Sequence, residues 1–425
     1  RGVQRSSDRC CTLQVGEADT VGIVVQKFGG TSVANEESRG MLVAKVTEAR
    51  HDGKDVVVVV SAMGRKPAPY ATDTLLDLVG SVCKSAPARE RDAIAACGEI
   101  ISTVVVATAL EAAGCPAVSL TGGQAGISTD SNYTDARITK IEPRRILEVL
   151  SDGKVAVVAG FQGVTETGDV TTLGRGGSDT TAAALGATLG AEIVEIYTDV
   201  EGVMTADPRV VPEARFQDTM SYTDLIEMAN QGAKVVHLRA VEIAMHSRIP
   251  LAIKSTFSDS PGTLVADVAR SAVATFAPPR VVSAVTTVAE RTQLVLRGDS
   301  YSDTGSVLGV FATLADQRIS VDMINVFPDR IAFIVASREA TAAIATLKEL
   351  GIEAETNPGC AKVSVVGEGM RGVPGVMARV ARALHDASVR VLQTSDSHYS
   401  ISCLVPEPDM ERAARALHAQ FELGK

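Results

Sequence analysis

Continuous apolar runs alternate with segments of helical periodicity over the first two thirds of the chain. Runs rich in valine and isoleucine lie at residues 23–28, 55–62, 154–161 and 192–200. Helical patterns between such runs include residues 36–51, 73–78 and 88–113. Strands without polar alternation are typical of a parallel sheet that is covered by helices on both faces. We therefore predict a mainly parallel α/β domain over residues 22–280, with ligands bound outside the carboxyl ends of its strands.

The pattern changes after a proline pair at residues 278–279, which marks a domain boundary. Beyond it, segments 292–326 and 361–396 share one plan: strand, glycine and acid, short loop, glycine, helix, strand. At an offset of about 70 residues, Gly305 aligns with Gly375, so the two segments form an internal repeat. Each copy continues with a strand and a helix, which gives the βαββα order of ferredoxin-like units.

The two copies differ in how they finish. The first, about 290–358, has a fourth strand at 351–357, whereas the second, about 359–425, finishes with a helix. A ferredoxin-like sheet that lacks one strand has an open edge. We predict that a strand at 281–288 completes the second βαββαβ unit, so that the two copies interlock around the first. Alternatively, the open edge pairs with another subunit.

Composition narrows the class of protein. A chain of 425 residues, 45% of them hydrophobic, is long enough for two or three domains. The net charge of −10 argues against nucleic acid as a partner, because phosphate binding needs a concentrated basic surface. No apolar run in the sequence approaches the ~18 residues of a membrane span. We therefore expect neither nucleic acid nor membrane partners.

Cysteines and histidines give no sign of disulfide or zinc chemistry. The seven cysteines include no CxxC pair, and the six histidines show no HExxH spacing. This usage favours reduced thiols in a cytoplasmic protein. Residues 1–21 lack an initiating Met and the apolar segment of a signal peptide, and we interpret them as a poorly ordered extension.

The first candidate site is KFGGTS, where the opening strand runs into a turn. Lys27 supplies a point charge, and Gly29 and Gly30 permit a close approach of the backbone to a ligand. Thr31 and Ser32 can cap a helix whose N-terminus faces phosphate. The alternative is a tight turn with a solvated lysine.

A second glycine-rich turn, GRGGSD, leads into an alanine-rich helix. Ser178 or Asp179 is placed to cap that helix. Arg175 has no such structural explanation, and a guanidinium on a glycine-rich loop suits carboxylate or phosphate recognition through two parallel hydrogen bonds.

The stretch YTDVEGVMTADPR follows a strand and supplies further charges. Asp199, at the carboxyl end of the strand, either orients ribose or metal-bound water or simply initiates a turn. Asp207 and Arg209 follow in a turn, and Arg209 and Lys234 add positive charge downstream. Each cation taken alone is also compatible with an ordinary surface position.

Glu99 lies beside a glycine in the apolar helical segment 88–113. A buried carboxylate requires a partner, so we expect Glu99 to meet either a neighbouring arginine or the ammonium group of a substrate. Together, two glycine turns, several cations and isolated acids favour phosphoryl transfer. A dinucleotide enzyme is disfavoured because no GxGxxG opens a helix after the first strand.

Five motifs give the chain a resemblance to the aspartate kinase family of the amino acid kinase superfamily. They are KFGGTSV, VVVVVSAMG, GRGGSDTTAAAL, YTDVEGVMTADPR and QGAKVVH. The resemblance extends over residues 22–425, because the repeated units are similar to tandem ACT domains. The departures are the N-terminal extension and His237, where the family motif often continues differently.

The resemblance implies Mg²⁺- and ATP-dependent phosphorylation of the β-carboxylate of L-aspartate to 4-phospho-L-aspartate, which leads to lysine, diaminopimelate, threonine and methionine. Lys27 would hold the transferring phosphate, and Asp179 would organise the charges around it. The implied substrate-binding residues are Thr31, Ser32, Ser61, Glu99, Arg175 and Ser178. The implied nucleotide-binding residues are Gly29, Gly30, Thr198, Asp199, Asp207, Arg209 and Lys234. No protein residue is implied as a direct metal ligand.

This chemistry agrees with the short set of catalytic groups. A carboxylate nucleophile with an ordinary pKa of about 3.9 is already ionised at neutral pH and needs no general base. The barrier lies in bringing an anion to a polyphosphate, which lysine and Mg²⁺ would lower by neutralising charge.

For the tandem units, the resemblance implies an amino-acid effector: diaminopimelate, lysine or threonine. Candidate effector contacts are Asp303, Gly305, Asp322 and Asn325. A packing or dimerisation module is the alternative, and unpaired sheet edges favour a homodimer through this region. Two rival functions remain open: a sister kinase acting on glutamate, acetylglutamate, carbamate or UMP, and a non-catalytic amino-acid sensor.

Overall fold

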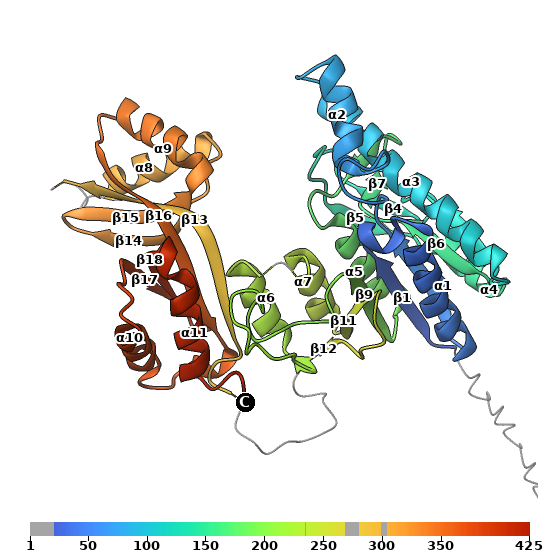
Figure 1. Ribbon diagram of the computed structural model, residues 1–425. Helices are drawn as coiled ribbons and strands as arrows, with labels where there is room; N and C mark the ends of the chain where they lie inside the picture. Colours follow the sequence, from blue (N-terminus) through green and yellow to red (C-terminus); the bar gives the residue numbers. More distant parts are fainter. Residues whose placement is uncertain (1–20, 234, 268–279, 299–303) are drawn as a thin grey trace, which may run out of the picture.

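The computed structural model describes residues 21–233, 235–267, 280–298 and 304–425. Figure 1 shows two domains, one in blue to yellow-green and the other in gold to red. Four sequence-based expectations lie outside the described residues: the 1–20 extension, the 278–279 proline pair, Lys234 and Asp303.

An eight-stranded sheet forms the centre of the first domain. Its central strands are β9 (Ile193–Thr198), β1 (Ile23–Phe28), β2 (Asp55–Val60) and β6 (Val155–Ala159), which lie side by side and run parallel. The outer strands are β3 (Ala117–Leu120) next to β6, and β11 (Leu251–Ser255), β12 (Thr263–Val265) and β10 (Thr219–Met220) beyond β9. Only the pairing of β12 with β11 is antiparallel among the strand pairs described in this sheet.

Helices cover both faces of this sheet, as predicted. Successive side chains of a strand point to opposite faces, so Val57 and Val59 join one core while Val56 and Val58 join the other. The first core includes side chains of α4 (Arg144–Ser151), α5 (Gly177–Leu189), α6 (Tyr222–Asn230) and α7 (Leu238–Ser247). The second includes side chains of α1 (Glu36–His51) and α3 (Ala88–Ala112).

Three smaller features border the carboxyl ends of the central strands. A 3₁₀ turn, η1 (Gly30–Val33), follows β1, and α2 (Thr72–Val82) projects from the domain against the start of α3 (Figure 1). The α2 helix is longer than the predicted 73–78. A four-stranded sheet is made from β5 (Ile138–Ile141), β4 (Ile127–Thr129), β7 (Gln162–Val164) and β8 (Val170–Thr172).

Helix α3 corrects the expectation that no segment is long enough to span a membrane. By length and composition alone, its 25 residues could cross one. A core helix passes the same test, and half of the most apolar window of α3 is buried in the protein. Val106 and Leu110 are fully buried against the central sheet.

The second domain is one six-stranded sheet shared by both repeat copies. Its strands, in order, are β14 (Asp322–Phe327), β15 (Arg330–Ala336), β13 (Ala284–Arg297), β16 (Ala354–Val366), β18 (Ser400–Pro406) and β17 (Gln393–Asp396). Its helices are α8 (Thr304–Asp316), α9 (Ser337–Glu349), α10 (Val376–Asp386) and α11 (Met410–Gln420).

Two long strands join the copies. The first part of β13, residues 284–288, pairs with residues 362–366 of β16, in the second copy. After an irregularity between Val288 and Arg291, β13 pairs with β15 and with the first part of β16, in the first copy. Of the strand predicted at 281–288, residues 284–288 therefore lie in β13, beside the second copy.

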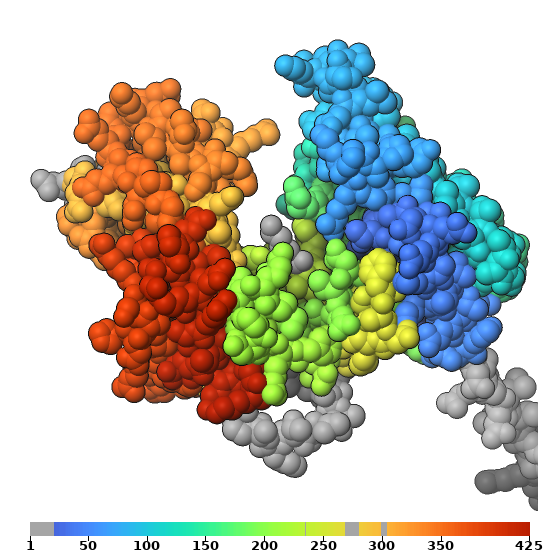
Figure 2. Space-filling view, in the orientation of Figure 1, coloured from blue at the N-terminus to red at the C-terminus, as the bar shows by residue number. Residues whose placement is uncertain are grey.

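The two domains meet through the second repeat copy. The hydroxyl of Thr205 lies 2.9 Å from Nε2 of His418 in α11, and the amide of Val285 donates to the carbonyl of Thr205. Ala206 and Val211 pack into the core of the second copy. Figure 2 shows that the domains diverge beyond this contact and leave a hollow between them.

Candidate active site

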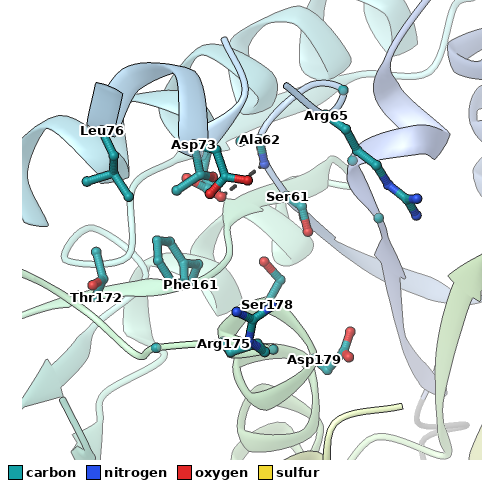
Figure 3. Close-up of a pocket in the computed structure, with 18 of the residues that line it drawn as sticks. Ser61, Ala62, Arg65, Asp73, Leu76, Phe161, Thr172, Arg175, Ser178 and Asp179 are labelled. Atoms are coloured by element: carbon teal, nitrogen blue, oxygen red, sulfur yellow. Dashed lines mark hydrogen bonds between the residues drawn. The ribbon is translucent and has the colours of Figure 1, made fainter. Parts of the chain in front are cut away.

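A cavity of about 570 Å³ lies where the four central parallel strands end (Figure 3). Residues just beyond β1, β2, β6 and β9 line it, namely Gly29, Ser61, Phe161 and Asp199. The fold brings these chain segments together because carboxyl ends of adjacent parallel strands meet at one edge of the sheet. The start of α5 forms the facing wall.

Most of the predicted site residues line this one cavity. They are Lys27, Gly29, Gly30, Thr31, Ser61, Glu99, Arg175, Ser178, Asp179, Thr198 and Asp199. Six predicted residues that the structure describes are absent from its wall: Ser32, Asp207, Arg209 and the effector candidates Gly305, Asp322 and Asn325. Sequence motifs far apart in the chain therefore converge on one site.

An ion pair occupies the floor of the cavity. Nζ of Lys27, in β1, lies 2.7 Å from Oδ1 of Asp179, in the first turn of α5, and both side chains are nearly buried. The backbone N–H of His237 donates to the other carboxylate oxygen of Asp179 at 3.4 Å. The pair fixes the position of the Lys27 ammonium group. An anionic ligand in the cavity can compete with Asp179 for this group.

The glycine turn after β1 is packed backbone against backbone. A Cβ on Gly30 would lie 2.7 Å from the carbonyl oxygen of Ala62 and 2.9 Å from that of Gly64. Gly29 has ordinary space around it. Gly30 therefore lets the turns after β1 and β2 touch, which keeps two edges of the cavity together.

The predicted helix caps are wrong. Helix α5 follows Gly176, which has a φ of 69° and provides no side-chain cap, while Ser178 and Asp179 lie inside the first turn. Helix α1 is capped by Asn35, whose side chain accepts from the amide of Ser38, and not by Thr31 or Ser32. The hydroxyl and carboxylate groups at the start of α5 are thus available to the cavity.

Glu99 is a buried carboxylate without a cation. It is 2% exposed, Oε1 accepts from the amide of Ala62 at 3.0 Å (Figure 3), and Oε2 has no hydrogen-bond partner in the structure. Burial raises the pKa of Glu99 to about 8. No arginine pairs with Glu99 in the described part of the chain, so the predicted ion pair with a neighbouring arginine is not observed.

Arg175 supplies positive charge at the opposite wall. It is exposed, and the glycines on either side of it, Gly174 and Gly176, adopt φ values of 72° and 69°. Its guanidinium forms no ion pair with any residue that the structure describes. Figure 3 draws Arg175, Ser178 and Asp179 together at the start of α5. The site therefore offers an anion-binding group near the buried carboxylate of Glu99.

Several wall residues escaped the sequence interpretation. They are Arg65, Thr72, Asp73, Leu76, Arg91, Asp92, Thr134, Phe161 and Thr172, with Ala62 and the glycines of the turns. Arg65 lies in the turn after β2, five residues beyond Val60, and pairs with Asp199 at 3.1 Å. The position of Arg65 in the turn after a strand could have identified it as a site residue. Spacing could have indicated Asp92, which lies seven residues before Glu99 on the same helical face.

The remaining predicted residues lie elsewhere. Ser32 is buried and accepts a hydrogen bond from the hydroxyl of Thr256. Arg209 is exposed and paired with Asp207 at 2.6 Å. Asp322 receives a hydrogen bond from Lys362, a buried lysine of the second copy.

The other two effector candidates lie in the first repeat copy. Gly305 falls in the first turn of α8. Asn325 lines a separate cavity of about 560 Å³ in the second domain.

The carboxylates of the main cavity do not form a metal cage. No group of three or more His, Cys, Asp or Glu side chains is gathered to hold an ion among the residues described. Asp73 and Asp199 reach the cavity wall as single carboxylates. This donor set suits a cation that arrives with its own ligands, such as phosphate oxygens and water.

Known proteins that are similar to this chain in sequence or fold share a description. The chain matches the amino acid kinase family over residues 22–255 and the ACT domain over residues 355–419. Aspartokinase 1 of Bacillus subtilis is 45% identical over 403 residues, which covers 95% of this chain and 100% of the relative. The aspartokinase of Corynebacterium glutamicum is 42% identical over 415 residues, with 95% and 96% covered.

A solved structure supports the same relationship. E. coli aspartokinase III in complex with aspartate and ADP is similar with a TM-score of 0.75 at 26% identity. The similarity covers 94% of this chain and 99% of that one. The same enzyme has also been solved with lysine and aspartate, in its T-state, with a TM-score of 0.75, 26% identity and the same coverage.

Proposed function

Because the chain belongs to the amino acid kinase family and is an aspartokinase, we propose that it transfers the γ-phosphoryl group of ATP to the β-carboxylate of L-aspartate. The observation that carries this proposal is the Lys27–Asp179 pair at the floor of a cavity that also presents Arg175 and Glu99. Those groups match the charges of a dicarboxylic amino acid beside a polyphosphate.

The reaction needs no proton transfer. A β-carboxylate oxygen attacks the γ-phosphorus, the bond to the β–γ bridging oxygen breaks, and ADP leaves with the electron pair. Lys27 faces the developing negative charge, while Asp179 keeps its ammonium group in place. The N-terminus of α5 points into the same cavity and favours anionic groups there.

Aspartate is held through the two charged groups that do not react, its second carboxylate and its ammonium group. Arg175 binds a carboxylate, and Glu99 accepts the ammonium group, which supplies the missing partner of its buried oxygen. Thr31, Ser61 and Ser178 line the same cavity and offer hydroxyl groups to the substrate. The complex of E. coli aspartokinase III with aspartate and ADP supports this choice of ligands.

The nucleotide lies toward Thr198 and Asp199, which line the β9 end of the cavity. Asp207, Arg209 and Lys234 stay predictions for the nucleotide side, and Ser32 stays one for the substrate side. Mg²⁺ is the metal we propose, carried on the ATP phosphates, where it would neutralise charge in the transition state. Asp199 is the wall carboxylate best placed to hold water on that metal, because it stands at the end of a central strand.

The second domain makes the enzyme allosteric, and its effector is diaminopimelate, lysine or threonine. The lysine-bound T-state of E. coli aspartokinase III supports an amino acid in this role. Gly305, Asp322 and Asn325 remain the candidate contacts. We place the enzyme in the cytoplasm, where its product would feed lysine, diaminopimelate, threonine and methionine synthesis.

A homodimer would form through the second domain. Ile324, Val326 and Phe327 on the edge strand β14 are between 42% and 47% exposed, which is a large apolar exposure for a sheet edge. A second copy of the chain would cover it.

The test is to incubate the protein with ATP, Mg²⁺ and L-aspartate and to trap acyl phosphate with hydroxylamine. We expect aspartyl hydroxamate, and suppression by one of the three effectors or by a pair of them. Hydroxamate formed only with glutamate or acetylglutamate would identify a sister kinase. Effector binding without any ATP turnover would identify a sensor.

A further inference from the structure

A buried carboxylate in the wall of the cavity is not used by the proposed chemistry. Asp92, in the second turn of α3, is 1% exposed, yet no cation pairs with it among the described residues. Its Oδ2 atom accepts from the amides of Thr134 at 2.9 Å and Thr172 at 2.8 Å. Its Oδ1 atom accepts from the hydroxyl of Thr172 at 2.8 Å. Three hydrogen bonds offset the cost of burying the carboxylate.

Both acceptor atoms are directed to loops rather than to the helix that carries Asp92. One loop contains Thr134, a residue with a φ of 73°, which a non-glycine side chain rarely adopts. The other begins at Thr172, at the end of β8, three residues before Arg175. Asp92 thus ties two separate segments of the cavity wall to one helix.

The tied segments also hold each other. The amide of Ala136 donates to the carbonyl of Thr172 at 2.9 Å. Arg239 pairs with Asp135 at 3.0 Å and donates to the carbonyl of Leu173 at 3.4 Å. These contacts join the segment 134–136 to Thr172 and Leu173. They therefore fix the chain immediately before Arg175.

The arginine turn itself has little of its own to fix it. Gly174 and Gly176 flank Arg175 at positive φ, and glycine restricts the backbone less than any other residue. The guanidinium has no ion-pair partner among the described residues to define its place. The position of Arg175 therefore depends on how firmly Thr172 and Leu173 are held.

We infer that Asp92 is a positioning residue for Arg175, and that it sets the affinity for the carboxylate of the substrate through the 172–176 turn. This inference rests on the proposed function, in which Arg175 binds aspartate. Both carboxylate oxygens of Asp92 are already bonded to Thr134 and Thr172, so we assign it a role through this turn and not on the substrate. Its effect should therefore appear in the KM for aspartate and leave the KM for ATP unchanged.

Two substitutions separate geometry from charge. In Asp92→Asn, the amide oxygen can still accept from both backbone N–H groups, and its NH₂ group can donate to the Thr172 hydroxyl, which also acts as an acceptor. Asp92→Ala removes all three hydrogen bonds. We expect Asp92→Ala to raise the KM for aspartate about tenfold or more, since small misplacements of binding groups are costly. Asp92→Asn should stay within about threefold, because it keeps the same contacts.

Thr172→Val provides a milder variant in case Asp92→Ala does not fold. It removes one hydrogen bond of the three and should raise the KM for aspartate about two- to fivefold. Its matched control is Thr103→Val, because Thr103 is also buried and its hydroxyl donates only within α3, to the carbonyl of Ile100. Thr103→Val should leave both KM values unchanged.

The measurement is the hydroxamate assay at varied aspartate and at varied ATP, with circular dichroism to verify folding. Asp92→Asn as damaging as Asp92→Ala would overturn the inference, because it would show that the charge acts on the substrate directly. An unchanged aspartate KM in Asp92→Ala, or in Thr172→Val if the former is unfolded, would also overturn it. Wild-type protein that forms no aspartyl hydroxamate would instead refute the proposed function, which the same assay reveals first.

Discussion

At the scale of single residues, the Lys27–Asp179 pair places one positive and one negative charge in the cavity before a ligand binds. Replacing Lys27 by Met removes the only cation at 2.7 Å from Asp179 among the ion pairs described. We expect kcat to fall at least about a hundredfold, the order found when one charge-stabilising donor is removed. Steady-state kinetics with the hydroxamate assay measures this change.

The control addresses stability, because removing one partner of a nearly buried pair leaves the other charge uncompensated, at a cost of up to roughly 3–5 kcal/mol. In the double variant Lys27→Met/Asp179→Asn, no such charge remains, so we expect the melting temperature to recover while activity stays lost. Recovery of activity together with stability would mean that the pair only supports the fold.

Glu99 gives a pH prediction. Burial raises its pKa to about 8, so the carboxyl group is protonated near neutral pH before a substrate binds. An ammonium group binds the ionised form, and the KM for aspartate should therefore fall by up to about tenfold per pH unit between pH 6.5 and 8. Kinetics at five pH values tests the slope. In Glu99→Gln the KM should be high and nearly independent of pH, whereas a wild-type slope in that variant would contradict the role.

The raised pKa of Glu99 also predicts how the stability of the folded protein changes with pH. The ordinary pKa is 4.5, and the folded value is higher, so the folded state keeps a proton that the unfolded state has lost between these two pH values. Stability from this group therefore falls as the pH rises from about 4.5 to about 8. Glu99→Gln removes that loss, and its melting temperature should rise relative to wild type as the pH increases from 6 to 9. A constant difference across this range would count against the raised pKa.

Reasoning from the sequence selected two charged residues that the fold brings to one cavity. Lys27 lies in β1 just before a glycine turn, Arg175 stands within a glycine turn, and both line the cavity, while their roles stay predictions. Asp207 and Arg209 were chosen by similar reasoning, but a turn does not fix a direction, and they pair with each other. Asp92 was missed because an acid in the first turns of a helix is ordinary. Its role depends on loops 42 and 80 residues away in the chain.

At the scale of elements, the site depends on how tightly the turns after β1 and β2 pack. A methyl group on Gly30 would meet two backbone carbonyls at 2.7 and 2.9 Å, which cannot move away as a side chain can. We expect Gly30→Ala to destabilise the protein by about 1–3 kcal/mol, as overpacking does. Thermal or urea unfolding measures the loss.

The matched substitution is Gly29→Ala. Its Cβ would lie 3.6 Å from Nζ of Lys27 and 3.8 Å from the carbonyl of Tyr197, and the φ of −71° suits alanine. Its stability should stay within about 0.5 kcal/mol of wild type. Equal losses in both variants would show that the site tolerates neither methyl group for a reason other than backbone contact.

Elements were predicted best where periodicity was strong. The valine-rich β2 runs from Asp55 to Val60, and its five valines are fully buried, as a continuous apolar strand implies. Spacing alone could not show that the strand ending one copy and the strand beginning the next are one element, β16. That fusion follows from pairing with β13, and pairing depends on tertiary structure.

At the scale of the whole molecule, the stretch after β9 connects the cavity to the second domain. Asp199 lines the cavity, and six residues later Thr205 contacts both β13 and α11. Further along, the guanidinium of Arg415 donates to the carbonyl of Val210 at 2.8 Å. A displacement of α11 or β13 would therefore act on a short segment that begins at the active site.

This arrangement predicts an uncoupling variant. Thr205→Val removes the hydroxyl that lies 2.9 Å from His418 and accepts from the amide of Arg215. We expect the effector concentration for half-inhibition to rise about fivefold or more, the low end of typical allosteric coupling. The uninhibited kcat should stay within about twofold, since Thr205 does not line the cavity.

The control is Thr286→Val on β13. Thr286 is buried like Thr205, but its hydroxyl has no hydrogen-bond partner among the residues that the structure describes, so its removal should leave inhibition unchanged. If Thr205→Val is inhibited as strongly as wild type, coupling must pass through another contact. Another contact between the domains is Gln231, after α6, whose amide oxygen accepts from the hydroxyls of Ser364 and Ser402 in the second copy. Gln231→Ala would then be the next variant expected to lose inhibition, and the Thr205 hydroxyl would serve only to join the domains.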